Sequence, residues 1–359
     1  MFIKRKNYLS KIDRIRVSEG RNLDKGLRLD RNERVDAWGN ETLMNIFKNT
    51  PDYFLSVYPE SSNLYKKLSN FLNIQESNFI LTSGIDGAIK TLFEILTKPG
   101  DIIGVPTPTY AMYYVYSKLF QVRLHNIEYK ENLEFNYDEF DKFLKTNPSI
   151  FFLPNPNQPI ESSFNVNELR EFANKTLKAD CLFVIDEAYH MFGCDSGIDL
   201  INEYENVVVM RTFSKGFGVP SIRLGYLISN EDNMSILSKT RFAHESNSLI
   251  NAVAEYLIDN YNIVQDYNNN VIKSKDNLKH DLKELGINTH GNNGNYLLLD
   301  MNSAERASKF VLYLKEKYIY VKGPWSNPWE KYITITIGPY KSMSRFVTAT
   351  REFIKNENK

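Results

Sequence analysis

The sequence contains little cysteine and no long apolar segment. Only two cysteines, Cys181 and Cys194, occur among 359 residues. They give no disulfide framework, and neither they nor the five histidines show the spacing of a metal site. Cys181 begins an apolar run and is interpreted as a buried thiol. No stretch approaches the roughly 18 consecutive apolar residues that a membrane-spanning helix requires.

An excess of charge of either sign is absent as well. Lysine and arginine total 44, aspartate and glutamate total 44, and the formal net charge is zero. The chain therefore lacks the global positive field that gathers nucleic acid or an anionic membrane, although local cations remain able to bind a small anion. The first ten residues are basic, but no apolar stretch of signal-peptide length follows them. We expect a soluble, cytoplasmic protein that binds neither nucleic acid nor a membrane.

Short apolar runs alternate with longer helical patterns through the middle of the chain. Hydrophobic residues make up 42% of the sequence, which is enough for one large core or for two cores that share an interface. This alternation predicts an α/β fold with a mostly parallel sheet that is covered on both faces. The predicted strands are 79–81, 101–106, 149–153, 182–185, 207–210 and 225–228.

The pattern changes after about residue 245. Polar helical segments reach residue 285, and a strand at 295–299, a helix at 304–317, strands at 318–322 and 332–337 and a last helix from Ser342 are expected to follow. This order predicts a smaller α+β domain. We assign 1–38 to an N-terminal arm that belongs to the smaller domain, 39–245 to the large domain and 246–359 to the smaller domain.

Lys215 is the first candidate for chemistry. It follows an apolar strand as Ser214-Lys215-Gly216, and Arg223 lies eight positions later between apolar neighbours. A lone lysine in a loop is usually a surface residue. A buried guanidinium, however, needs an anion such as a phosphate, and a lysine that forms an imine must lose its proton. The pair favours a reactive amine beside an anion-binding site.

Asp186 closes the predicted strand 182–185 in the run Val184-Ile185-Asp186-Glu187-Ala188-Tyr189. A buried carboxylate is costly unless it is paired. One interpretation is a carboxylate that faces the protonated ring nitrogen of a pyridine cofactor. The other is a helix N-cap, and the sequence favours neither.

Two turns follow predicted strands and present polar groups. Thr82-Ser83-Gly84-Ile85-Asp86 opens a helix, where exposed backbone N–H groups and the helix dipole suit a phosphate. The segment 154–160 holds three prolines and three amides, which predicts a rigid turn that presents side-chain donors. Each of the two is also an ordinary turn when it is considered alone.

Together these motifs resemble the fold-type I enzymes that depend on pyridoxal phosphate (PLP), and specifically the branch of histidinol-phosphate aminotransferase. The resemblance covers nearly the whole chain in order. It implies a PLP-dependent transferase fold of type I, an aminotransferase activity and a homodimer with shared active sites. It also implies that Lys215 forms the Schiff base with PLP and moves the proton between the substrate Cα and the cofactor C4′. Asp186 would pair with the ring nitrogen, and Tyr189 with the phenolic oxygen.

The resemblance assigns further contacts to the cofactor. These are Ser83, Gly84, Ile85, Asp86, Ser214 and Arg223 at the phosphate, Tyr110 stacked on the ring, and Tyr58 reaching the phosphate of the neighbouring subunit. The amide turn Asn157-Gln158 completes the set, with Gln158 facing the phenolic oxygen where the family has asparagine.

The substrate side departs further from the family pattern. Asn32-Glu33 matches the substrate-side motif, and Lys322 and Arg345 match positions that face a distal phosphate. Thr334 stands where the family has the arginine that holds an α-carboxylate, and threonine offers no bidentate fork. This favours a small phosphorylated amine or ketone without an α-carboxylate, such as histidinol phosphate. It leaves the residue that holds the carboxylate of the amino donor unnamed.

Other functions remain open at this point. Pro220 suggests a PLP-dependent decarboxylase of a phosphorylated amino acid, similar to threonine-phosphate decarboxylase. A PLP-binding regulator and an α/β protein without a cofactor are two further alternatives. If the chain is an aminotransferase, a small phosphorylated substrate of surface-sugar or amino-alcohol phosphate synthesis has the same weight as histidinol phosphate.

Overall fold

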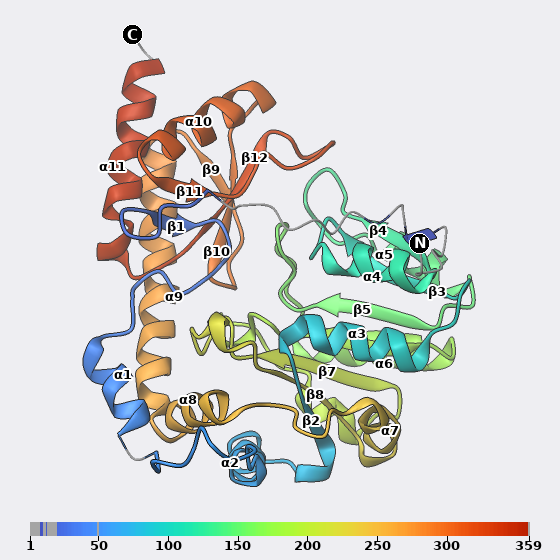
Figure 1. Cartoon of the computed structure of the whole chain (residues 1–359). Helices are drawn as coiled ribbons and strands as arrows, with labels where there is room; N and C mark the ends of the chain where they lie inside the picture. Colours follow the sequence, from blue (N-terminus) through green and yellow to red (C-terminus); the bar gives the residue numbers. More distant parts are fainter. Residues whose placement is uncertain (1–7, 10–11, 13–19, 49, 358–359) are drawn as a thin grey trace, which may run out of the picture.

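A seven-stranded sheet forms the centre of the larger part of the molecule (Figure 1). The computed structural model describes residues 8–9, 12, 20–48 and 50–357. The strands lie in the order β2 (Phe79–Thr82), β8 (Gly225–Ser229), β7 (Val207–Thr212), β6 (Leu182–Asp186), β5 (Ile150–Pro154), β3 (Ile102–Thr107) and β4 (Arg123–Glu128). Only β8 runs against its neighbours in this sheet. The predicted mostly parallel sheet is therefore confirmed.

Helices cover both faces of this sheet. One face carries α3 (Gly84–Leu96), α4 (Met112–Phe120) and α7 (Glu231–Leu237). The other carries α2 (Ser62–Leu72), α5 (Tyr137–Leu144), α6 (Val166–Lys178) and α8 (Ser248–Asp259). Successive strand residues serve opposite cores, because side chains alternate across a strand. Phe151 is buried under the second group of helices and Phe152 under the first, which explains why these strands read as unbroken apolar runs.

A smaller unit stands above the large sheet (Figure 1). Its antiparallel sheet has the order β12 (Tyr332–Thr336), β10 (Tyr296–Asp300) and β9 (Asn288–His290). Around it lie α9 (Tyr261–Glu284), α10 (Ala304–Glu316) and α11 (Tyr340–Glu357). A separate two-stranded parallel sheet joins β1 (Leu27–Leu29) to β11 (Ile319–Val321). The N-terminal segment thus lies beside the smaller unit.

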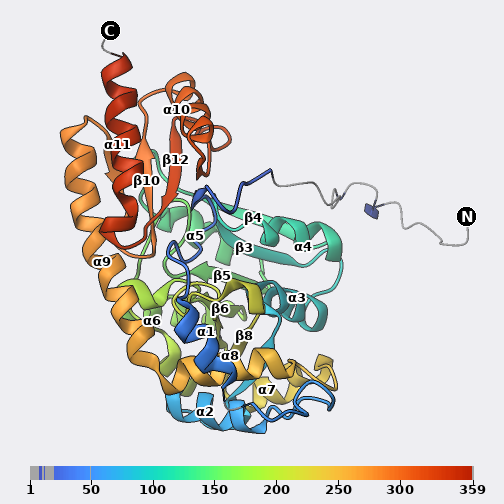
Figure 2. The same cartoon turned by 60° about the vertical axis from the view of Figure 1, so that its left-hand side comes forward.

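The long helix α9 connects the two units, and both views show it running from α8 up to α11 (Figure 2). Val253 and Leu257 of α8 and Val264 of α9 belong to the core of the large sheet. From Tyr267 onward, α9 contributes to the core of the smaller unit. The packing therefore changes inside α9 and not at residue 246, and the domain limits given above remain predictions.

The remaining elements are short. The helix α1 (Asn40–Phe47) packs near α8, and in residues 50–357 short 3₁₀ turns lie at Glu76–Asn78, His190–Phe192, Ile198–Asn202, Pro220–Ile222 and Ser238–Thr240. None of the helices in the described ranges is both long and apolar enough to cross a membrane. The carboxyl ends of β2, β3, β5, β6 and β7 meet at one edge of the large sheet, which is where ligands bind in sheets of this kind.

Candidate active site

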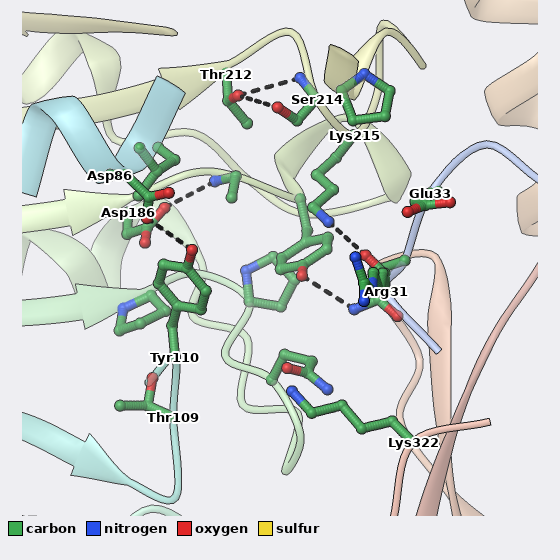
Figure 3. A pocket seen from close by; sticks show the side chains of 18 of the residues that line it. Arg31, Glu33, Asp86, Thr109, Tyr110, Asp186, Thr212, Ser214, Lys215 and Lys322 are labelled. Atoms are coloured by element: carbon green, nitrogen blue, oxygen red, sulfur yellow. Dashed lines mark hydrogen bonds between the residues drawn. The ribbon is translucent and has the colours of Figure 1, made fainter. Parts of the chain in front are cut away.

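A cavity of about 720 Å³ opens at this edge, between the large sheet, the N-terminal segment and the smaller unit. Figure 3 shows its labelled side chains converging from all three parts. The cavity is lined by Asp30, Arg31, Asn32, Glu33, Ile85, Asp86, Thr109, Tyr110, Pro154, Pro156, Gln158, Asp186, Ala188, Tyr189, Thr212, Ser214, Lys215, Pro220, Arg223, Val321, Lys322 and Gly323.

Lys215 extends into this cavity from the turn after β7 (Figure 3). Its Nζ donates a hydrogen bond of 2.7 Å to the carbonyl oxygen of Arg31. Burial lowers the pKa of Lys215 to about 8, and the nearby cations Lys322 and Arg223 act in the same direction. A substantial fraction of the amine is therefore neutral near physiological pH, as a lysine that forms an imine requires.

Asp186 lies at the end of β6 and is only 3% exposed. Its carboxylate accepts hydrogen bonds from the Tyr113 hydroxyl at 2.7 Å and from the Ala188 N–H at 3.1 Å. Burial raises the pKa of Asp186 to about 6, while the bond from Tyr113 lowers it. The next helical turn begins at His190 and is capped by Tyr189, so Asp186 is not a helix N-cap. It is a buried anion that lines the cavity.

The neighbouring Glu187 points away from the cavity, because consecutive side chains at a strand end face opposite sides. Its carboxylate accepts a hydrogen bond of 2.8 Å from the buried Arg211 on β7, and others from Ser196 and the Gly197 N–H. This buried pair braces the end of β6 from behind. It holds the main chain that carries Asp186.

Arg223 lies over the first turn of α3 and forms an anion-binding corner with it. Its guanidinium donates to the Ser214 hydroxyl at 3.3 Å and to the Asp86 carboxylate at 3.5 Å. A Cβ at Gly84 would come within 2.8 Å of the Arg223 Nη2, and Gly84 has a φ of +67°. Glycine alone suits both the backbone and the close approach. A cation, a hydroxyl and the N-terminus of a long helix suit a dianionic phosphate.

Two tyrosines form walls of the cavity. The Tyr110 hydroxyl donates to Asp86 at 2.7 Å, and its ring meets the Tyr113 ring edge-on at 6.4 Å. The Tyr189 hydroxyl accepts a 3.0 Å hydrogen bond from the Asn32 side chain. Burial raises the pKa of both Tyr110 and Tyr189, so both hydroxyls stay protonated at neutral pH. The face of an aromatic side chain in the cavity wall suits a planar ring.

The cavity brings together most of the residues predicted to contact cofactor or substrate. These are Asn32, Ile85, Asp86, Tyr110, Gln158, Asp186, Tyr189, Ser214, Lys215, Arg223 and Lys322. Five others do not line it: Ser83, Gly84, Asn157, Tyr58 and Arg345.

These five lie in different environments. Ser83 is exposed, and Gly84 is buried beneath Arg223. The Asn157 amide links its own turn to the loop after β3: its oxygen accepts a 2.7 Å hydrogen bond from the Thr109 hydroxyl, and its nitrogen donates to the carbonyl oxygens of Pro108 and Ile160. It therefore holds the loop that presents Gln158.

Tyr58 and Arg345 lie at the surface of the chain. The Tyr58 side chain is 78% exposed, and its ring stacks on His244 at 4.6 Å. Arg345 donates hydrogen bonds to the carbonyl oxygens of Lys25, at 2.6 Å, and Lys317. The structure thus brings Lys322 but not Arg345 into the cavity.

The sequence interpretation assigned no role to several residues of the site, among them Arg31, which lines the cavity, and Tyr113, which contacts Asp186. Tyr113 carries no motif of its own, and its helical spacing from Tyr110 is the only signal that links it to the cavity. Arg31 directly precedes the Asn32-Glu33 motif. It lies at the cavity because β1 pairs with β11 in the folded chain, and the local sequence does not indicate this pairing. Within the described ranges, no cluster of three or more His, Cys, Asp or Glu side chains is placed to hold a metal ion.

Comparisons with known proteins agree with this geometry. The family model described as aminotransferase class I and II matches residues 24–348. A histidinol-phosphate aminotransferase of Brachyspira hyodysenteriae is 31% identical over 318 residues, which cover 87% of each chain. A dihydroxyacetone phosphate transaminase of Campylobacter jejuni is 27% identical over 342 residues, 92% of this chain and 91% of the relative.

Among solved structures, the fold is similar to that of histidinol-phosphate aminotransferase from Sinorhizobium meliloti in complex with pyridoxal-5'-phosphate. The TM-score is 0.84 at 20% sequence identity, and the match covers 92% of this chain and 91% of that one. This likeness confirms the predicted transferase fold.

Proposed function

The chain belongs to the family of class I and II aminotransferases, and from that membership we propose that it transfers an amino group between an amino-acid donor and a small phosphorylated ketone. It is a PLP-dependent aminotransferase. The identity of its substrate is our proposal. We expect a ketone of the size of dihydroxyacetone phosphate or of the keto counterpart of histidinol phosphate. Two relatives named for phosphorylated substrates support this choice.

The residues of the cavity fit the cofactor. Ser214, Arg223 and the first turn of α3 suit its phosphate, as the corner described above combines a cation with helix N–H groups. The buried carboxylate of Asp186 suits a protonated ring nitrogen, because a cation there compensates its burial. Tyr110 would lie against the face of the ring, and Tyr189 and Gln158 would contact the phenolic oxygen.

Bound PLP supplies an electron sink that stabilises negative charge at the carbon attached to the reacting nitrogen. Lys215 would supply the base: its Nζ would take the proton from the substrate Cα and return it two atoms further along, to the carbon on the other side of the reacting nitrogen. Its lowered pKa keeps the neutral form available for this step. Tyr189 and Asn32, joined by their 3.0 Å hydrogen bond, fix the wall against which the substrate is oriented.

One observation carries the choice of substrate: Lys322 lines the cavity, and Thr334 does not. Thr334 is 1% exposed, and its hydroxyl accepts a 2.9 Å hydrogen bond from the Trp325 indole. Position 334 therefore provides no cation to the cavity, whereas Lys322 provides an ammonium group. Both half-reactions of a ping-pong cycle would use this one cavity, and the donor carboxylate and the substrate phosphate would be held there in turn.

A homodimer with shared active sites belongs to the same proposal. The side chains of Met44, Leu55, Tyr58 and Phe242 are each more than two-thirds exposed. Large apolar side chains that are left exposed favour an interface with another copy of the chain. We further propose that Tyr58 reaches the cofactor phosphate of the partner subunit. A cytoplasmic location also remains a prediction.

The test is a pair of single-turnover reactions on the PLP-loaded protein. Histidinol phosphate is added to the PLP form, and dihydroxyacetone phosphate to the amine form prepared with glutamate. Amino transfer with at least one phosphorylated compound, and none with its dephosphorylated analogue, supports the proposal. Release of CO₂ from threonine phosphate without conversion of the cofactor would instead establish the decarboxylase. A Lys215→Ala variant provides the background for both reactions.

A further inference from the structure

A lysine that the mechanism above does not use is buried in the long helix α9. Lys275 is 2% exposed, and its Nζ donates hydrogen bonds to the carbonyl oxygens of Asn293, at 2.6 Å, and of Gly294, at 2.5 Å. Burial lowers the pKa of Lys275 to about 7, while the negative charge of Glu161 raises it. A buried ammonium is costly unless it is compensated, and here two carbonyl groups and a carboxylate compensate it.

The compensating carboxylate belongs to the large unit. Glu161 directly follows the amide turn 154–160 and is 8% exposed. Its carboxylate accepts a hydrogen bond of 2.8 Å from the Asn292 N–H and one of 3.5 Å from the Asn293 side chain. The loop 291–295, which joins β9 to β10, therefore has an ammonium at its carbonyl groups and a carboxylate at its N–H groups. Hydrogen bonds of this kind, with one charged partner, are the strong ones.

Other contacts hold the same loop against the large unit. The Gly294 N–H donates to the carbonyl oxygen of Phe192 at 3.2 Å, and the His290 ring donates to the carbonyl oxygen of Glu161 at 2.9 Å. A Cβ at Gly193 would lie only 2.9 Å from the side-chain oxygen of Asn293. The loop 291–295 is thus a closely packed junction between the two units.

The junction leads to the cavity through Tyr296, the first residue of β10. The Tyr296 hydroxyl donates to the carbonyl oxygen of Asn157, and its ring meets the Tyr189 ring edge-on at 5.1 Å. Asn157 directly precedes Gln158, and both Gln158 and Tyr189 line the cavity. Tyr296 therefore supports the two side chains that we expect at the phenolic oxygen of the cofactor.

We propose that Lys275 and Glu161 form an ionic clamp across the loop 291–295, and that this clamp positions Gln158 and Tyr189 at the cofactor. The proposal rests on the function proposed above, which places those two side chains at the phenolic oxygen. Lys275 acts through the loop and Tyr296, so it is a positioning residue and not a catalytic one. Both charges are needed, because removal of one leaves the other buried without its partner.

The test follows the visible absorbance of the bound cofactor as the pH is varied. A hydrogen-bond donor at the phenolic oxygen disperses the negative charge there, so the neighbouring Schiff-base nitrogen holds its proton less tightly. Gln158→Leu removes a donor directly and should raise the midpoint pH of the absorbance change by about one unit. Lys275→Met loosens the position of the donors and should raise the midpoint by about half a unit.

Three single variants and one double variant test the charges themselves. Lys275→Arg keeps the charge and the donors and should restore the original midpoint, and Lys273→Met, at an exposed position of the same helix, should leave it unchanged. Glu161→Gln keeps an acceptor for the Asn292 N–H without the charge and should shift the midpoint as Lys275→Met does. The double variant of Glu161→Gln and Lys275→Met should shift it by less than the sum of the two, because each residue acts through the other.

A lysine that only stabilises the fold predicts a lower melting temperature of Lys275→Met with an unchanged midpoint, and that result overturns the positioning role. An equal shift in Lys275→Arg overturns the role of the charge, and additive shifts overturn the pair. If Lys275→Met does not fold, an unshifted midpoint in Glu161→Gln overturns the clamp. A shift in Lys275→Met without one in Gln158→Leu overturns the route through the amide turn. These spectra need no substrate, so a failure of amino transfer to phosphorylated ketones leaves their result standing.

Discussion

The hydroxyl of Tyr113 donates a 2.7 Å hydrogen bond to the carboxylate of Asp186. Tyr113 is fully buried on α4, and Asp186 ends β6, so the bond joins a covering helix to the floor of the cavity. Two effects on Asp186 oppose each other: burial raises the pKa of the carboxyl, and this bond lowers it. Tyr113 therefore favours the ionised form, which a positively charged ring nitrogen needs as its partner.

Replacement of Tyr113 by phenylalanine should weaken the affinity of the cofactor-free protein for PLP. The pKa of Asp186 would rise above about 6, and the acid limb of the affinity-against-pH curve would move to higher pH. Loss of one hydrogen bond to a charged group corresponds to about tenfold near pH 6. Tyr114 lies on the same helix as Tyr113 and its hydroxyl donates to Thr107 at the end of β3, so the Tyr114→Phe variant should match the original protein. An acid limb that stays in place would show that Tyr113 does not control this carboxyl.

The burial of Asp186 should lower the stability of the cofactor-free protein. The pKa of Asp186 is 3.8 when exposed and about 6 in the folded chain. Its contribution to stability is therefore fully present below pH of about 4 and is lost as the pH rises through about 6. At neutral pH, Asp186→Asn should increase the free energy of unfolding by up to about 3 kcal/mol while it abolishes transamination. Urea unfolding of both proteins without PLP measures this difference, and a less stable variant would contradict it.

Capture of PLP by the cofactor-free protein should become faster as the pH rises toward 8. Burial lowers the pKa of Lys215 to about 8, and only the neutral amine attacks the aldehyde. The rate should increase about tenfold per pH unit below this value and flatten above it. Stopped-flow absorbance follows the reaction, and Lys215→Ala should lack the pH-dependent phase. A midpoint near 10 would show that the cavity leaves this lysine unperturbed.

The strands of the large sheet were predictable because they are buried on both faces. Val207–Thr212, for example, is apolar except where it nears the cavity, and such runs need no knowledge of their neighbours. β4 (Arg123–Glu128) is not predicted from the sequence, since it lies at the edge of the sheet and only one of its six residues is buried. β1 (Leu27–Leu29) has three residues and exists through its pairing with β11. The residues of β1 alone do not indicate that β11 is its partner strand.

The same distinction applies to the site. Lys215, Asp186 and Arg223 each belong to a short sequence motif that indicates the chemistry of the side chain. The structure places all three in one cavity. Arg31 reaches the Lys215 amine through a backbone contact that spans 184 residues of sequence. The position of Arg345 also depends on distant backbone, because its two carbonyl acceptors belong to the N-terminal segment and to the end of α10. Such contacts depend on packing between units and leave no local pattern.

Removal of the Arg345 side chain should affect stability and not substrate affinity. Arg345→Gln loses hydrogen bonds to the carbonyls of Lys25 and Lys317, which should lower the free energy of unfolding by about 1 kcal/mol. The KM for a phosphorylated ketone should stay within the error of the original value. Steady-state kinetics and urea unfolding separate the two effects. A large increase in KM with unchanged stability would return Arg345 to the substrate site, as the family resemblance implies.

Shared active sites predict complementation between two inactive variants. Lys215→Ala removes the reactive amine, and Tyr58→Ala removes the exposed ring proposed to reach the partner's cofactor phosphate. In a mixed dimer, one site carries both changes and the other carries neither. Random mixing of equal amounts should therefore restore about a quarter of the original activity, because half of the dimers are mixed and each has one intact site. Mixing after unfolding and refolding together, with each variant refolded alone as the control, measures the recovery. If activity only averages that of the two variants, Tyr58 acts within its own subunit or not at all.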